Sequence, residues 1–173
     1  MPGWRPVVDP AEFNLTRLLR RLVGGGVDFL VIGGVAVVVH ASPRFTKDLD
    51  IVYATTPENL ERLGAVLTEL NARLRGIDED IPFVADPRTL RATQILCLVT
   101  DEGNLDLLVD PDGAADYGTM RRRAVEIELD GVRVPVASID DLIAMKDAAG
   151  RPQDVLDIES LETARRLRRA GPR

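Results

Sequence analysis

The sequence predicts an α/β (α+β) domain in which helices flank a mixed central β-sheet. Short apolar runs alternate along the chain with longer segments in which leucines recur every three or four residues, the patterns of strands and helices respectively. Two of the apolar runs, 94–100 and 105–109, are separated by a polar turn of hairpin length, which predicts neighbouring antiparallel strands. These observations together favour one sheet with helices packed on it.

The size and composition of the chain indicate one domain. With 173 residues, 45% of them hydrophobic, it can bury one core, so we expect a single domain over residues 1–173, with a core at about 28–135 and a C-terminal helical part at 138–170. The longest apolar run, 29–39, is too short to span a bilayer and lacks signal-peptide flanks, which predicts a cytoplasmic protein with no membrane partner. The net charge of −6 argues against a protein that coats nucleic acid.

Capping residues and glycines mark the ends of the predicted helices in the N-terminal half. After an irregular arm at 1–8, Asp9 is expected to cap a helix that the glycine run 24–26 ends. The next predicted elements are a strand at 28–32, a helix at 35–40, a strand at 48–53 and a helix opened by Thr56 whose leucine stripe runs to Leu74. Residues 76–92 are predicted to be a surface loop leading to Arg88 and Arg91. These arginines could contact phosphate or an acceptor, but we favour the alternative that they are solvated loop charges.

The C-terminal half continues the same pattern. Beyond the two strands already described, the predicted elements are a short helix at 114–121, a hairpin of 124–129 with 132–135, a helix capped by Ser138, and a last helix from Pro152. The buried face of that last helix is expected to hold Ile158, Leu161, Ala164 and Leu167. Cys97, the one cysteine, is expected to be a buried core residue.

Gly33 and Gly34 end the first strand and open the following helix. A residue without a β-carbon allows unusual dihedral angles and close approach of a ligand to the backbone. A helix that starts at such a turn presents free N–H groups, which favour phosphate binding. The glycine pair is therefore a candidate nucleotide-binding turn.

Asp48 and Asp50 lie two residues apart in the second strand, so they share a face of the sheet. Two carboxylates that close repel each other unless a cation lies between them. Asp106 adds a third carboxylate from an apolar segment expected to pair beside these strands. Mg²⁺ prefers such oxygen ligands together with substrate phosphates, so the three aspartates predict a site for two Mg²⁺ ions, with Mn²⁺ as an alternative.

This pattern resembles the nucleotidyltransferases of the DNA polymerase β superfamily, whose motif is a Gly-Gly or Gly-Ser turn, Asp-x-Asp about a dozen residues later, and a further single Asp. Gly33, Gly34, Asp48, Asp50 and Asp106 match it. The resemblance implies the nucleotidyltransferase fold and the use of an NTP. One departure is Val35, where the family often has a phosphate-binding Ser or Thr.

A second segment, from Lys146 to Asp157, resembles the Lys…Arg-x-Lys-Asp-x-x-Asp signature of the AbiE-like toxin nucleotidyltransferases. In that group the lysine and the first aspartate are functional, which implies catalytic roles for Lys146 and Asp154, although Gln153 replaces the usual lysine. A lysine near a triphosphate offsets charge on the leaving group. The alternative is a surface ion pair of little energetic weight, with Asp157 merely favouring the helix N-terminus.

Three further residues lie near the main motif. Arg44 and Thr46 match the Arg-x-Thr-x-Asp-x-Asp form of the same branch, which implies nucleotide binding, whereas loop solvation is an equal alternative for Arg44. His40 is the only histidine. We favour a packing role for it over a general base, because two-metal chemistry does not require a base there.

We accordingly expect an enzyme that moves an NMP from an NTP to an acceptor hydroxyl. The resemblance to the toxin branch implies the 3′ end of tRNA as acceptor and a cognate antitoxin protein as partner, with arginines at 121–123 and in the last helix as candidate RNA contacts. The alternatives are transfer to a small molecule, as in antibiotic-modifying relatives, transfer to a protein, as in AMP-transferring antitoxins, and a catalytically silent binding module.

Overall fold

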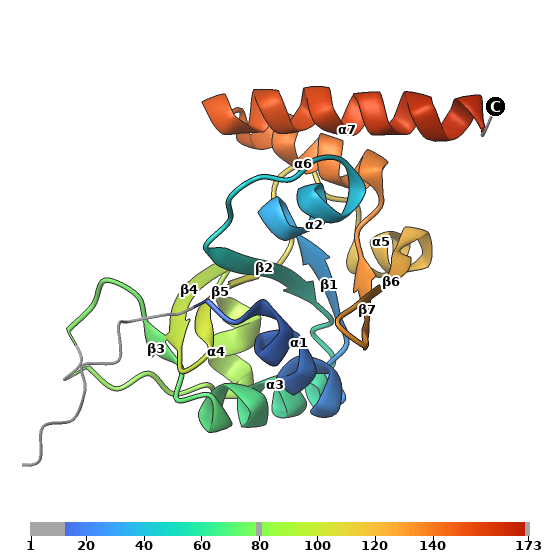
Figure 1. The fold of residues 1–173 in the computed structure, drawn as a ribbon. Coiled ribbons are helices and arrows are strands. Elements are labelled where there is room, and N and C mark those ends of the chain that lie inside the picture. The colour runs from blue at the N-terminus through green and yellow to red at the C-terminus, as the bar shows by residue number, and fades with distance from the viewer. Residues whose placement is uncertain (1–12, 79–80, 172–173) are drawn as a thin grey trace, which may run out of the picture.

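A computed structural model describes residues 13–78 and 81–171 (Figure 1). Its helices are α1 (Leu15–Gly24), α2 (Gly33–His40), α3 (Pro57–Glu69), α4 (Pro87–Ala92), α5 (Tyr117–Arg123), α6 (Ile139–Ala149) and α7 (Pro152–Ala170). Its strands are β1 (Phe29–Ile32), β2 (Asp48–Tyr53), β3 (Arg73–Leu74), β4 (Ile95–Thr100), β5 (Gly103–Leu108), β6 (Val125–Leu129) and β7 (Val132–Val136).

The strands form one mixed sheet in the order β3-β4-β5-β2-β1-β7-β6, which confirms the predicted fold class. β2 runs parallel to β5 and β1 runs parallel to β7, while the other neighbouring pairs are antiparallel. Figure 1 shows α2, α6 and α7 on one side of the molecule and α1, α3 and α4 on the other. None of the described helices is long and apolar enough to cross a membrane.

Alternation in the central strands separates the core from the site. Leu49, Ile51, Leu105 and Leu107 are fully buried, whereas the residues between them in sequence include the acidic ones. The leucines of α3 pack on the sheet, with Leu60, Leu63 and Leu67 fully buried, as their spacing predicts. Burial of these two apolar sets fixes the face on which the polar residues of β2 and β5 must lie.

Two elements differ from the prediction. α3 ends at Glu69, because Asn71 adopts a positive φ of 50°, and Leu74 therefore belongs to β3. The predicted loop at 76–92 contains α4, capped by the Asp86 side chain, which accepts a hydrogen bond from the Thr89 N–H, and anchored by fully buried Leu90. α1 begins at Leu15 behind the N-cap Asn14, while the predicted start at Asp9 lies outside the described residues.

α6 and α7 form the C-terminal helical pair. Ser138 caps α6 as predicted, and Gly150 ends it with a left-handed φ of 63°. The expected buried face of α7 is wrong in part: Leu161 is buried but Leu167 is 69% exposed, and the buried side of the first turns carries Asp154 and Asp157 instead. Two buried aspartates on a helix require cationic partners, and these define part of the site described below.

Candidate active site

The parallel pairing of β2 with β5 brings the three predicted metal ligands together. Asp50 lies directly opposite Asp106, and Asp48, two residues earlier on the same face, lies opposite Asn104. The Asn104 side chain donates a hydrogen bond of 2.9 Å to Asp48 Oδ1. The three carboxylates therefore share one face at the end of the sheet where β1 leads into the glycine turn.

Burial and the neighbouring negative charges raise the pKa values of Asp50 and Asp106. Burial, together with the negative charges of Asp106 and Asp48, raises the pKa of Asp50 to about 7, although Lys146 and Arg151 oppose the shift. Burial also raises the pKa of Asp106. A carboxyl whose pKa is higher in the folded than in the unfolded state loses stability as the pH rises through that range. A bound cation would relieve this repulsion, so the donor set suits a hard divalent metal.

Arg75, just after β3, lies among these carboxylates and was missed by the sequence analysis. One of its guanidinium nitrogens donates to Asp48 Oδ1 at 3.1 Å and the other donates to Asp106 Oδ1. No local motif signals this contact, because it depends on the pairing of β3 with β4. Within residues 13–78 and 81–171, no three acidic, histidine or cysteine side chains converge on a common metal position, and the Arg75 guanidinium contacts both Asp48 and Asp106.

The glycine turn packs directly against this cluster. Gly33 has a φ of 66°, and a β-carbon there would collide with the Asp50 carboxylate. A β-carbon on Gly34 would lie 2.7 Å from the guanidinium of Arg44 and 3.0 Å from the Thr46 hydroxyl. α2 begins at this turn without a side-chain cap, which leaves its first N–H groups available to a ligand.

Replacing Gly33 with Ala is expected to reduce nucleotide binding and stability together, because the new methyl group displaces Asp50. Gly131→Ala is the matched control, since Gly131 has a similar φ of 78° but a β-carbon added to it would meet nothing within 4 Å. Both variants lose about 1–2 kcal/mol from the left-handed backbone, and only Gly33→Ala should lose more and fail to bind an NTP. Urea unfolding measures the change in stability, and NTP titration measures nucleotide binding. Equal losses of unfolding free energy and of NTP affinity in both variants would show that the methyl group at Gly33 does not displace Asp50.

Lys146 and its partners form a buried ion cluster beside the carboxylates. Lys146 Nζ lies 3.2 Å from Asp154 Oδ1 and 2.8 Å from Asp157 Oδ2, and the three side chains are only 7%, 2% and 3% exposed. Arg151 completes the pairing of Asp154 with a 2.9 Å contact from its Nε. The alternative, that Lys146 and Asp154 form a surface ion pair, is therefore wrong, because both side chains are buried.

Asp157 is a second residue that the sequence analysis undervalued. Besides Lys146, it contacts Arg44 Nε at 3.3 Å and accepts a hydrogen bond of 3.1 Å from Gln153. Arg44 therefore reaches from the edge of the glycine turn to α7, rather than being solvated in its loop. The Thr46 hydroxyl donates to the Asp48 carbonyl at 3.2 Å, which braces the start of β2.

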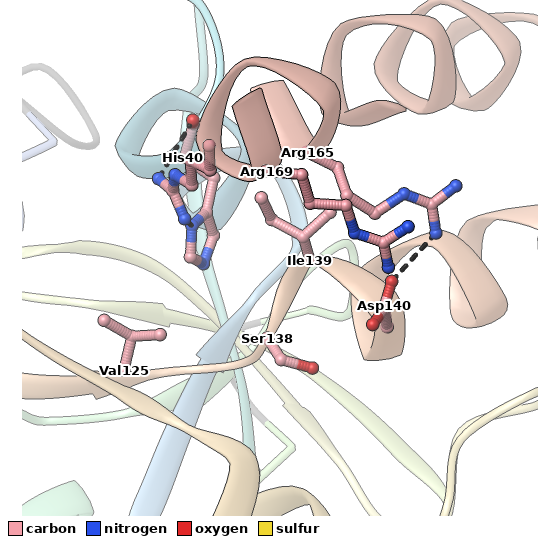
Figure 2. Close-up of a pocket in the computed structure, with 8 residues that line it drawn as sticks. His40, Val125, Ser138, Ile139, Asp140, Arg165 and Arg169 are labelled. Atoms are coloured by element: carbon pink, nitrogen blue, oxygen red, sulfur yellow. Dashed lines mark hydrogen bonds and ion pairs between the residues drawn. The ribbon is translucent and has the colours of Figure 1, made fainter. Parts of the chain in front are cut away.

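His40 has a packing role. Its Nε2 lies 2.8 Å from the Ala137 carbonyl oxygen and its Nδ1 is 3.1 Å from Arg168, so in the tautomer that satisfies both contacts Nε2 donates and Nδ1 accepts. Burial lowers the pKa of His40 despite the Ala137 hydrogen bond, and the Arg168 charge lowers it further. His40 lines the pocket drawn in Figure 2 together with Asp140 of α6 and Arg165, Arg168 and Arg169 of α7, and the lining does not include Asp48, Asp50 or Asp106.

Two further expectations are corrected. Cys97 is only half-buried and lies opposite Asp106 in the pairing of β4 with β5, so its side chain borders the acidic face instead of the core. Arg91 is not simply solvated, because it donates to the Thr55 carbonyl at 3.3 Å, whereas Arg88 is exposed on α4.

Three carboxylates, a glycine turn at a helix N-terminus and a buried lysine cluster lie together at this end of the sheet. Two solved structures share the fold. ANT(2″)-Ia in complex with adenylyl-2″-tobramycin has a TM-score of 0.52 at 16% identity, covering 90% of this chain and 92% of that chain. The lincosamide adenylyltransferase LnuA, lincomycin-bound, has a TM-score of 0.60 at 15% identity, covering 89% and 98%. No curated protein matches the chain.

The chain belongs to the family of AbiEii nucleotidyl transferase toxins of type IV toxin–antitoxin systems, whose family model matches residues 17–167. It is therefore a transferase enzyme, and its family implies an NTP substrate and an antitoxin partner. This confirms the resemblance that the glycine turn, the aspartates and the Lys146 segment indicated.

Proposed function

We propose that the enzyme transfers an NMP from an NTP to the 3′ hydroxyl of a tRNA, as the cytoplasmic toxin of its toxin–antitoxin pair. The observation that carries the proposal is the position of Asp48, Asp50 and Asp106 on one face of the sheet, against Gly33. The two glycines and the α2 N-terminus would hold the triphosphate, Lys146 would offset charge on the leaving pyrophosphate, and Asp154 would position Lys146.

Asp48, Asp50 and Asp106 are the residues that would hold the divalent cations, Mg²⁺ or Mn²⁺. When bound, such ions offset the charge of the triphosphate and favour ionisation of the acceptor hydroxyl. In the transfer itself, the acceptor oxygen forms a bond to the α-phosphorus, the bond from that phosphorus to the pyrophosphate oxygen breaks, and the hydroxyl proton passes to the Asp106 carboxylate. Arg44 and Thr46 keep the loop before β2 against the glycine turn while this occurs.

RNA recognition is assigned to the pocket of Figure 2 in preference to Arg121 and Arg123. Arg121 and Arg123 are already paired with Glu126 and Asp141, at 3.1 and 3.0 Å. In contrast, Arg168 contacts only the neutral His40 and its backbone, and Arg169 has no ion-pair or hydrogen-bond partner within the described chain. Asp140 lines the same pocket but pairs with Arg165, so the guanidinium groups of Arg168 and Arg169 have no ion-pair partner among the described residues and can bind phosphate oxygens.

The Arg168→Gln, Arg169→Gln double variant is expected to bind tRNA more weakly and with a flatter salt dependence. Loss of two phosphate contacts should reduce the slope of log K against log[salt] by about 1.4–1.8. The control, Arg62→Gln with Arg133→Gln, removes the same charge from exposed positions on other elements and should keep the slope. Fluorescence anisotropy over a salt series measures both, and equal slopes would exclude the pocket as an RNA contact.

Transfer to a small molecule is the second candidate, favoured by the similarity in fold to enzymes that the solved structures show with an aminoglycoside product or with lincomycin. The acceptor is decided by offering labelled NTP with intact tRNA, with periodate-oxidised tRNA that lacks a 3′ diol, and with tobramycin or lincomycin. Label on intact tRNA alone supports our proposal. Label on both tRNA forms, or on an antibiotic alone, contradicts it.

A further inference from the structure

We propose that Arg75 is a built-in cation that holds Asp48 and Asp106 before substrate binds and then moves to the triphosphate of the incoming metal–nucleotide complex. This inference rests on the proposed function. Its starting point is that one guanidinium donates to two of the three metal-binding candidates at once. No other described cation contacts either carboxylate directly in the structure.

The position of Arg75 reduces the electrostatic repulsion among the three carboxylates. Three carboxylates on one face of β2 and β5 repel one another, and this protein forms no ready-made metal position among its described residues. The two guanidinium nitrogens of Arg75 donate to two different carboxylates, so Arg75 neutralises part of their charge while the nucleotide is absent. A free divalent ion must first displace these hydrogen bonds, which weakens its binding.

The surroundings of Arg75 also let its side chain leave. The Arg75 side chain is 28% exposed, and its backbone N–H is fixed by a 2.9 Å hydrogen bond to the Cys97 carbonyl. The guanidinium can therefore turn away while the backbone stays paired to β4. A triphosphate bound at the glycine turn offers oxygens that suit the same paired donors as the carboxylates that Arg75 gives up. Arg75 thus favours the metal–NTP complex over the free metal.

The predicted consequence is a strong thermodynamic coupling between metal and polyphosphate that depends on Arg75. Titration of Mn²⁺ by electron paramagnetic resonance, with and without inorganic tripolyphosphate, measures it without knowing the base of the NTP. In the native protein, tripolyphosphate should tighten Mn²⁺ binding strongly. In Arg75→Gln, free Mn²⁺ should bind about tenfold more tightly and the effect of tripolyphosphate should fall by a similar factor.

Arg133→Gln, which removes the same charge from an exposed site on β7, is the control and should behave as the native protein. Arg75→Lys keeps the charge but not the paired donors, so it should fall between the native protein and Arg75→Gln, and it replaces Arg75→Gln if that variant does not fold. Unchanged or weaker binding of free Mn²⁺ in folded Arg75 variants overturns this inference about Arg75 but leaves the proposed metal site intact. Absence of Mn²⁺ binding in the native protein under both conditions overturns the proposed metal site as well.

Discussion

Asp50→Asn is expected to lower the rate of nucleotidyl transfer roughly 1,000-fold or more, the equivalent of about 4 kcal/mol of transition-state stabilisation by the metal site. Asn keeps the size of the side chain but removes the charge that a divalent cation requires. Asp50 is opposite Asp106 in the strand pairing and touches the glycine turn, so its loss affects both metal and phosphate binding. Initial rates with saturating NTP and Mg²⁺ measure the effect.

The same substitution should not destabilise the fold at neutral pH. The pKa of Asp50 is about 7 in the folded protein, against an ordinary value of 3.8, so the native carboxyl loses stabilising free energy as the pH rises between these values. Asn does not ionise, and the stability of Asp50→Asn relative to the native protein should therefore increase over this range. Asp112→Asn, at an exposed turn, serves as the control. A variant that is inactive because it is unfolded would contradict this account.

Asp157→Ala is expected to cost about 3–5 kcal/mol of unfolding free energy, because it leaves Lys146 with half of its partners in a buried site. Lys146 Nζ is 2.8 Å from Asp157, and both side chains are almost fully buried. Arg44 loses its contact at 3.3 Å at the same time. Activity should fall with stability, because the substitution displaces the lysine that we propose offsets charge on the leaving pyrophosphate.

Asp140→Ala provides the matched comparison for this second prediction. Asp140 pairs with Arg165 at 2.9 Å, but the two side chains are 64% and 34% exposed, so its loss should cost no more than about 1 kcal/mol. Replacing Lys146 with Met in the Asp157→Ala background should recover part of the stability, because no buried lysine then remains unpaired. Equal losses for Asp157→Ala and Asp140→Ala in urea unfolding would show that the cluster is an ordinary surface network.

The predictable parts of the site are those determined by residue spacing within one strand or turn. The period of two in β2 placed Asp48 and Asp50 on one face, and the glycine pair marked the turn before α2. The partner strand could be chosen because Asp106 lies in an apolar run, which the structure pairs with β2. In each case spacing along one element determines which side chains point the same way.

The contacts of Arg75 and Asp157 could not be predicted from the sequence, because their partners come from distant elements. Arg75 reaches Asp48 and Asp106 only once β3 pairs with β4, and β3 is two residues long, too short to leave a periodic signal. Asp157 resembles an ordinary acidic residue near a helix start until α7 packs against α6 and the loop that carries Arg44. Tertiary packing sets the contacts of both residues, although Asp157 is also the last aspartate of the motif that begins at Lys146.

The central claim, that this site transfers a nucleotidyl group, is tested most directly by following the label from NTPs carrying ³²P at either the α or the γ position. The protein is incubated with all four NTPs, Mg²⁺ and total tRNA, alongside Asp48→Asn. We predict that α-label enters tRNA with one or more of the NTPs, that γ-label leaves as pyrophosphate, and that Asp48→Asn neither incorporates α-label nor releases labelled pyrophosphate. Transfer of γ-label to the acceptor, or equal transfer by Asp48→Asn, would contradict the account.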